Sequence, residues 1–251
     1  MRTKKFQRML VALMMVCMMG MLGVSALAED GGITITSQSV QETTEDLTVD
    51  YAYPAFAADD EALAQALDAA ITQACAAQLE ALREEYKVFA ADRTEEQQQL
   101  YTDDEAYRDE ITGTYDVLSN DGRLLQILTT VSYRPAGGNG DWDRLNTYVF
   151  DLEGQRLLAL TDVFADEESA IYAALTEAVT ARLDTLEGIY DGAAVIVDAD
   201  TCFYLDDAEM ALHLVFEPYA LSKEDQDVAL DIGALPLEPT AVVPGDRKSV
   251  V

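Results

Sequence analysis

The stretch "ITGTYDVLSNDGRLLQILTTVSYRP" (residues 111–135) decides the fold, because the apolar pattern takes a period of two here. This period is typical of β-strands whose alternate side chains face opposite sides of a sheet. The polar segment Ser119–Gly122 divides the stretch, and Gly122 supplies the positive φ that a tight turn needs. We therefore expect two antiparallel strands joined as a hairpin.

Similar patterns continue towards the C-terminus. A strand is expected at 145–152, and "QRLLALTDVF" (155–164) forms another after a turn at Glu153-Gly154. Residues 201–219 read as a second hairpin, and "QDVALDIGAL" (226–235) adds a last strand. Neighbouring strands are thus joined by short turns, which favours antiparallel pairing.

Two amphipathic helices interrupt the strands. Residues 33–56 contain two strand-like runs, and Pro54 ends the second of them. A long helix follows from about Asp60 to Lys87, and residues 91–110 form an exposed connection. The second helix begins near Asp166. The apolar stripes recur at steps of three and four: Leu63, Leu67, Ile71, Cys75, Leu79, Leu82 and Tyr86, then Ile171, Leu175, Val179, Leu183 and Leu186.

The order of elements predicts an α+β fold: an antiparallel β-sheet with two amphipathic helices packed on one face. We expect one domain over residues 29–251, with an N-terminal half (29–164), a C-terminal half (165–238) and a loose tail (239–251). The predicted core includes Leu67, Ile71, Leu79, Phe150, Leu175, Val179 and Phe216.

The first 28 residues have the features of a signal peptide. Arg2, Lys4, Lys5 and Arg8 precede an apolar run from Met9 to Val24, and Ala26-Leu27-Ala28 matches a signal peptidase site. The run is shorter than the ~20 residues of a membrane-spanning helix, so we expect cleavage between Ala28 and Glu29. Retention as an anchor is the alternative. We expect no membrane span after cleavage, and an extracytoplasmic location, either secreted or associated with the cell envelope.

Charge narrows the class of partner. The chain has 16 basic and 47 acidic residues, a formal charge of −31. Cleavage removes four of the 16 basic residues and no acidic ones, which leaves 12 against 47, or −35. Such a chain repels nucleic acid and anionic membranes and favours cationic partners. Plain solubility outside the cell is the other interpretation.

Several kinds of catalytic site are disfavoured. His213 is the only histidine, whereas zinc hydrolases usually draw on two or three His or on sets of Cys. The alternating strand "MALHLVFEP" places His213 on a solvent-facing or half-covered position, and no Ser lies in a nucleophile-elbow context. Acidic pairs are so common here that none marks a site. We therefore predict no catalytic residues, no cofactor and no metal site.

Cys75 and Cys202 remain after signal cleavage. A disulfide between them is one outcome in an exported protein. The other is two separately buried thiols, because Cys75 lies on a helix stripe and Cys202 alternates with Phe203 on its strand.

The glycine-rich loop after Tyr133 is a candidate ligand contact. "GGNG" (137–140) lacks the Lys-Ser/Thr and the following helix of a phosphate-binding loop. Glycines that shape a sheet corner are the simpler explanation. Tyr133, Asn139 and Trp142 flank or lie in this corner, and aromatic side chains often dominate binding energy. We predict that these three residues contact a ligand from the surface.

The succession of "VDYAYPAF" (49–56), "YDVLSNDGRLLQILTTVSYRPAGGNG" (115–140), "LNTYVFDLEGQRLLALTDVF" (145–164) and "CFYLDDAEMALHLVFEPYAL" (202–221) resembles the extracytoplasmic domain of RsiV-type anti-sigma factors. The same module precedes the catalytic domain of some peptidoglycan polysaccharide deacetylases. This chain departs from the pattern at Asn139-Gly140, where the family commonly carries Ala-His. Only eight residues precede the apolar run, so we expect no sigma-factor control by this chain alone.

The resemblance implies a non-enzymatic binding or sensing module of the cell envelope. Its ligand would be a cationic protein such as lysozyme or a cell-wall polymer. Two alternatives stand beside it: an enzyme that acts on wall glycan through a carboxylate pair, and a structural subunit of an envelope complex. The sequence leaves the oligomeric state open.

Overall fold

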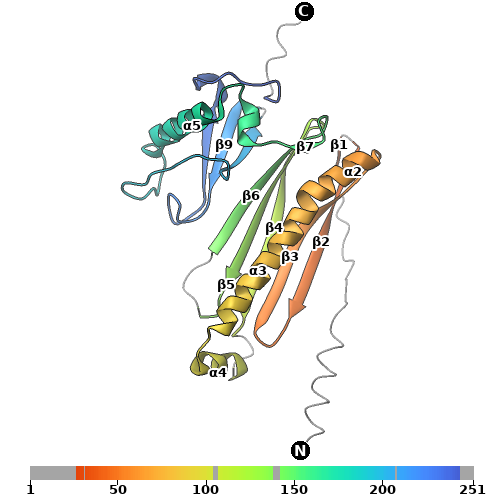
Figure 1. The fold of residues 1–251 in the computed structure, drawn as a ribbon, viewed down its shortest axis with the longest axis vertical. Helices are drawn as coiled ribbons and strands as arrows, with labels where there is room; N and C mark the ends of the chain where they lie inside the picture. The colour runs from red at the N-terminus through yellow and green to blue at the C-terminus, as the bar shows by residue number, and fades with distance from the viewer. Residues whose placement is uncertain (1–26, 31, 104–106, 138–141, 207, 244–251) are drawn as a thin grey trace, which may run out of the picture.

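The computed structural model describes residues 27–30, 32–103, 107–137, 142–206 and 208–243. It confirms the α+β class, with two separate sheets (Figure 1). The large sheet runs in chain order: β1 (Leu27–Asp30), β2 (Ile33–Thr43), β3 (Leu47–Ala58), β4 (Asp109–Asn120), β5 (Leu124–Arg134), β6 (Trp142–Asp151) and β7 (Arg156–Leu157). The small antiparallel sheet has the order β10 (Gln226–Asp231), β9 (Ala211–Phe216) and β8 (Cys202–Asp206).

The hairpin expected at residues 111–135 is present as β4 and β5. Val117 pairs with Ile127, and Gly122 in the turn has a φ of 82°. The pairing of β3 with β4, however, is parallel, so the large sheet is mixed rather than antiparallel. A parallel pair needs a crossover of a dozen or more residues. The segment between these two strands provides the crossover. Its helices return along the sheet to the end at which β3 begins.

The crossover contains three helical segments and a π-helical turn. Asp60 caps the first segment, accepting hydrogen bonds from the backbone N–H groups of Ala62 and Leu63. The predicted helix is therefore confirmed, and an additional helix lies in the segment expected to be an exposed connection. The segments are α2 (Glu61–Leu67), the π turn η1 (Asp68–Thr72), α3 (Gln73–Ala91) and α4 (Glu95–Asp103).

The two amphipathic helices cover different sheets, which corrects the expectation that both lie on one face of a single sheet. Leu67 and Ile71 pack against Ile127 of the large sheet, and α3 continues diagonally across the same face (Figure 1). The second helix, α5 (Glu168–Leu183), buries Leu175 in a cluster that contains Leu214 of the small sheet. Each amphipathic stripe thus has its own sheet to cover.

The opposite face of the large sheet joins the two parts. Leu124 and Val149 belong to the same buried cluster as α5 and the small sheet, whereas their neighbours Leu125 and Phe150 pack with Leu67 and Ile71 on the other face. The buried Gln126 side chain donates a hydrogen bond to the Leu205 carbonyl at 2.8 Å and accepts one from the Leu205 N–H at 2.7 Å. The Gln126 amide thus makes the pair of hydrogen bonds with Leu205 that a neighbouring strand would make with β8. The shared core makes the two halves one packed unit.

Most predicted core residues are buried, with Leu67, Ile71, Leu79, Phe150, Leu175 and Val179 all at most 4% exposed. Phe216, the last residue of β9, is only partly buried at the edge of its cluster, which corrects its assignment. The expectation of a loose tail is wrong for residues 239–243, because Thr240 donates its N–H to the Val163 carbonyl at 2.9 Å and Val243 is buried.

Pro54 does not end its strand, as β3 continues to Ala58 beside β2. It is tolerated because the pairing with β4 stops at Tyr51, so the missing N–H costs no bond on that side. The strand expected at 155–164 shortens to β7 and is followed by a 3-10 turn, η2 (Leu160–Val163). A second such turn, η3 (Ile232–Ala234), ends the region predicted as the last strand.

The predicted signal segment and tail lie largely beyond the described residues. Residues 1–26 and 244–251 are outside them, and β1 spans the expected cleavage point between Ala28 and Glu29. Within the described ranges, no helix has both the length and the apolar character needed to cross a bilayer.

Gly113 of β4 allows the Tyr51 ring to cross the parallel strand pair. A Cβ at this position would lie 2.4 Å from a Tyr51 ring carbon, and Tyr51 is held by a hydrogen bond from its hydroxyl to the Cys75 carbonyl. We therefore expect Gly113→Ala to lower the unfolding free energy by about 1–3 kcal/mol through overpacking. Urea denaturation measures this.

Gly233→Ala is the matched control, because the nearest atom to an added Cβ there is an Asp231 carboxylate oxygen at 3.3 Å. We expect a change within about 0.5 kcal/mol. Equal effects of the two variants would contradict the proposed contact between Gly113 and Tyr51.

Candidate functional site

The structure separates the three residues predicted to contact a ligand. Tyr133 is 1% exposed, which corrects its assignment to the surface: its ring packs beneath α3, and its hydroxyl donates to Asp109. Asn139 lies outside the described residues. Trp142 begins β6 opposite Tyr133, and its side chain is also outside the described part. The predictions for Asn139 and Trp142 therefore stay predictions.

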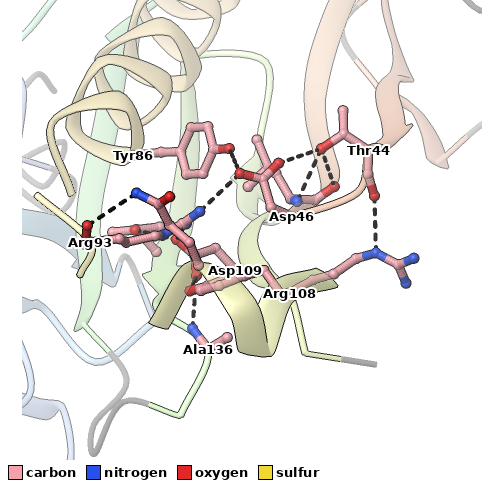
Figure 2. Close-up of polar contacts among 11 residues, drawn as sticks. Thr44, Asp46, Tyr86, Arg93, Arg108, Asp109 and Ala136 are labelled. Carbon is pink, nitrogen blue, oxygen red and sulfur yellow. Dashed lines mark hydrogen bonds and ion pairs between the residues drawn. The ribbon is translucent and has the colours of Figure 1, made fainter. Parts of the chain in front are cut away.

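Asp109 is the centre of a polar cluster at this end of the large sheet (Figure 2). It is the first residue of β4, and it is 1% exposed. The Tyr133 hydroxyl donates to its Oδ2 at 2.6 Å, and the Ala136 N–H donates to its Oδ1 at 2.9 Å. The Tyr101 hydroxyl donates to the same Oδ1. Three donors from different segments thus converge on one buried carboxylate.

Arg93 joins this carboxylate to a second one. Its guanidinium donates to Asp109 at 2.7 Å and to Asp46 at 2.9 Å, and only 10% of its side chain is exposed. The guanidinium also stacks 3.8 Å from the centre of the Tyr101 ring. Such stacking and forked hydrogen bonding is available to arginine and not to lysine.

Asp46 precedes β3, as Asp109 begins β4, so the parallel pairing brings the two acids to the same end of the sheet. The backbone N–H of Asp109 donates to the Asp46 carbonyl at 2.9 Å. The Tyr86 hydroxyl, from the last turns of α3, donates to the Asp46 carboxylate at 2.6 Å. The ends of β3, β4, α3 and α4 are therefore tied together by one network.

The ionisation of the cluster favours fixed hydrogen bonds over proton transfer. Burial raises the pKa of Asp46, but hydrogen bonds from Tyr86 and Arg93 outweigh it and leave that pKa below its usual value. Burial, with the neighbouring carboxylates, raises the pKa of Tyr86 to about 12 and moves the pKa values of Tyr101 and Tyr133 further above their usual range. The three tyrosines are thus hydrogen-bond donors at neutral pH, and the Asp46 carboxylate is an acceptor.

A pocket of about 310 Å³ opens beside this network. Its lining carries two carboxylates, of Glu45 and Asp46, and one cation, Arg93. Glu45 is exposed, whereas Tyr101 is 8% exposed and therefore presents little of its ring. Gln98 completes the lining. Among the residues that the structure describes, the lining has an excess of one negative charge, which suits a cationic group.

The glycine-rich loop begins at this same network. Ala136, bound through its N–H to Asp109, is followed by Gly137 with a φ of 67°. A Cβ on Gly137 would lie 2.3 Å from the Tyr107 hydroxyl. Close packing and the left-handed backbone both require glycine here. The loop that carries Asn139 is thus anchored at the end of the sheet where the pocket lies.

The two cysteines are free thiols in separate places. Cys75 is buried among side chains of the large sheet under the helices, whereas the Cys202 thiol, on β8, donates to the Leu145 carbonyl of β6 at 3.2 Å. Burial raises the pKa of both thiols. In the structure the two thiols are not joined, and Cys75 is buried whereas Cys202 is partly buried.

Sequence reasoning missed Arg93 and Asp109. Both lie at the borders of the segment interpreted as an exposed connection, and Arg93 is one of few cations in a very acidic chain. The available signal was a lone arginine before a polar segment, which could have marked Arg93 as a paired residue. No local pattern, however, indicates that Asp46 and Asp109 bind its guanidinium.

Comparison with known proteins identifies the fold. A crystal structure of a DUF3298 family member from Bacteroides fragilis NCTC 9343 superposes with a TM-score of 0.54 and 17% identity, over 80% of this chain and 90% of that one. A DUF3298 family protein from Pseudomonas aeruginosa PAO1 gives 0.52 and 13%, over 86% and 98%. No protein-family model and no curated protein sequence matches the chain. The similarity establishes a fold shared with DUF3298 proteins.

We expect Arg93→Met to destabilise the protein by about 3–5 kcal/mol, because it leaves the buried Asp109 carboxylate without its cation. Arg83→Met is the control, since Arg83 pairs with the exposed Glu42 and Glu80 and should cost at most about 1 kcal/mol. Chemical denaturation of both variants measures the loss in unfolding free energy. Similar losses for the two would show that the Arg93 network does not stabilise the fold more than a surface ion pair does.

Acid should weaken the same network through Asp46. A folded-state pKa below the unfolded value of about 3.8 means that Asp46 stabilises the fold above this pH, and that the contribution is lost as pH falls through the folded pKa. The difference in unfolding free energy between wild type and Asp46→Asn should therefore be largest at pH 7 and shrink below about pH 4. A urea series from pH 7 to pH 2 measures it. A difference that grows on acidification would reverse the sign of the assigned shift.

Proposed function

We propose that this protein is an exported, non-enzymatic binding module of the RsiV-like kind, and that its ligand is a cationic protein such as lysozyme. The observation that carries the proposal is the acidic pocket beside Glu45 and Asp46 on a rigidly tied end of the large sheet. The formal charge of −31 acts in the same direction, because it steers cations towards the whole molecule.

The state of Asp46 and Asp109 supports binding rather than catalysis. Asp46 and Asp109 share the Arg93 guanidinium and also accept hydrogen bonds from tyrosine hydroxyls. A general acid or a nucleophile needs a carboxylate that is free to exchange a proton or attack a substrate. Both of these carboxylates are already engaged, so the cluster serves as a support. This makes the wall-glycan enzyme the weaker candidate.

The pocket also favours a cationic side chain over a wall polymer. Sugar rings typically stack on exposed aromatic faces, but Tyr101 is 8% exposed and Arg93 covers its ring. Glu45, by contrast, is exposed at the pocket and can pair with a lysine or arginine of a partner. The glycine-rich loop with Asn139 and Trp142 would extend the contact on the same end of the sheet.

The test measures binding of hen egg-white lysozyme and of cytochrome c, a second cationic protein, by biolayer interferometry at 0.15 M salt. We expect a preference for lysozyme, because specific contacts survive screening over a Debye length of about 8 Å. Glu45→Gln should weaken lysozyme binding by about 3- to 10-fold, the effect of losing one ion pair at an interface.

Glu187→Gln is the matched control, because it removes the same charge from an exposed position beyond α5. It should change affinity less than twofold. Equal binding of the two cationic proteins, lost together at 0.15 M salt, would leave only nonspecific attraction and refute the proposal. Binding to purified peptidoglycan without lysozyme binding would select the wall polymer, and release of sugar products from it would select the enzyme.

A further inference from the structure

The outer face of the small sheet carries a second polar cluster around His213. The imidazole of this residue stacks on the Tyr204 ring, with centres 4.3 Å apart and an angle of 11° between the planes. Its Nδ1 lies 2.8 Å from Asp227 Oδ1, and the other oxygen of that carboxylate accepts the Tyr204 hydroxyl. Two neighbouring strands therefore fix the plane and direction of the ring. The side chain is 13% exposed, so it is more covered than the solvent-facing or half-covered position expected from the sequence.

The second ring nitrogen of His213 lacks such a partner in the part of the chain that the structure describes. Nε2 is buried, and it makes no hydrogen bond with any of the residues that the structure describes. A buried polar atom without a partner typically costs about 1–3 kcal/mol. Because Asp227 accepts a hydrogen bond from Nδ1, the neutral imidazole carries its proton there and leaves a lone pair on Nε2. The imidazole plane therefore holds this lone pair in a fixed direction, and a neutral imidazole nitrogen is a common metal ligand.

Two carboxylates lie next to this histidine. Ligand atoms of Asp206, Glu209 and His213 are all within 4.8 Å of one another. The Asp206 carboxylate is positioned by its own turn, since Oδ1 accepts hydrogen bonds from the N–H groups of Ala208 and Glu209 at 2.8 and 3.2 Å. An ion bound at Oδ2 would keep both bonds. Glu209 is exposed, so its side chain is free to move the short distance that coordination requires.

We propose that Asp206, Glu209 and His213 form a binding site for one divalent transition-metal ion of the zinc class. The set of one imidazole and two carboxylates matches the ligands that zinc takes in proteins, at about 2.0–2.2 Å each. Three protein ligands leave a coordination position for water or for a group of a partner. Asp227 acts as the positioning residue, because a carboxylate on the far ring nitrogen orients the histidine and makes it a stronger ligand.

The donor set distinguishes this site from general attraction of cations to an acidic chain. Carboxylates alone suit Mg²⁺ and Ca²⁺, whereas an imidazole ligand favours zinc and its neighbours. The ion therefore depends on His213, the only histidine of the chain. The site is independent of the acidic pocket, since it lies on the small sheet rather than at the end of the large one.

The single histidine permits a direct test. The protein, purified without a polyhistidine tag, is titrated with ZnCl₂ in 0.15 M NaCl and 5 mM MgCl₂, and the imidazole nitrogens are followed by two-bond ¹H–¹⁵N NMR. Before zinc, the spectrum should show the tautomer protonated at Nδ1. Zinc should then shift the Nε2 resonance in a saturable manner, at one ion per chain by equilibrium dialysis.

Variants assign the remaining ligands. His213→Gln and Glu209→Gln should each lower zinc affinity at least tenfold, and Asp227→Asn about 10- to 100-fold. The control Asp184→Asn, which removes an exposed charge at the end of α5, should change it less than twofold. Circular dichroism confirms that each variant is folded, and the exposed Glu209 provides a test that does not disturb the core.

Three results would overturn the proposal: an Nε2 resonance that zinc does not shift, a starting tautomer protonated at Nε2, or dialysis in which wild type and Glu209→Gln bind zinc equally. The last would mean that the carboxylates take up cations without forming a site.

Discussion

The guanidinium of Arg93, placed between Asp46 and Asp109, is the interaction on which the end of the large sheet depends. It connects the starts of two parallel strands to the segment between α3 and α4. Burying a cation and an acid is costly unless each group is paired. Here the tyrosine hydroxyls and the Ala136 N–H satisfy the remaining acceptor positions. The network therefore favours one arrangement of the crossover and disfavours alternatives that would leave a charge unpaired.

This network determines what the neighbouring surface can do. The acids that support the pocket are committed to hydrogen bonds, and the exposed Glu45 adds a further negative charge to its lining. The glycine-rich loop starts from an atom bound to Asp109, so its entry is fixed. A pocket whose acidic side chains are held by this network is consistent with the proposed binding of a partner. Because Asp46 and Asp109 are already hydrogen-bonded, they are poorly suited to acid–base chemistry.

The small sheet is attached to the opposite face of the large one through Gln126 and a shared apolar cluster. The Gln126 amide makes the two backbone hydrogen bonds that a paired strand would make with Leu205. β8 can therefore lie against the large sheet without continuous strand pairing. His213, Tyr204 and Asp227 gather on the other face of the small sheet. The fold therefore carries two chemically different polar regions, one an acidic pocket and one a histidine with carboxylates.

The sequence by itself determined most of the strands and the two amphipathic helices, but not α4 or the short length of β7. Period-two patterns predicted β4, β5, β8 and β9, and stripes at steps of three and four predicted the helices, whose Leu67 and Leu175 are buried as expected. These patterns depend on nearby residues and on burial of one face. Only the tertiary structure decided that β3 and β4 run parallel, that each helix has its own sheet, and that Tyr133 is buried. The candidate site was hidden for the same reason: Asp46, Arg93 and Asp109 are joined by long-range pairing, which leaves no periodic signal in the chain.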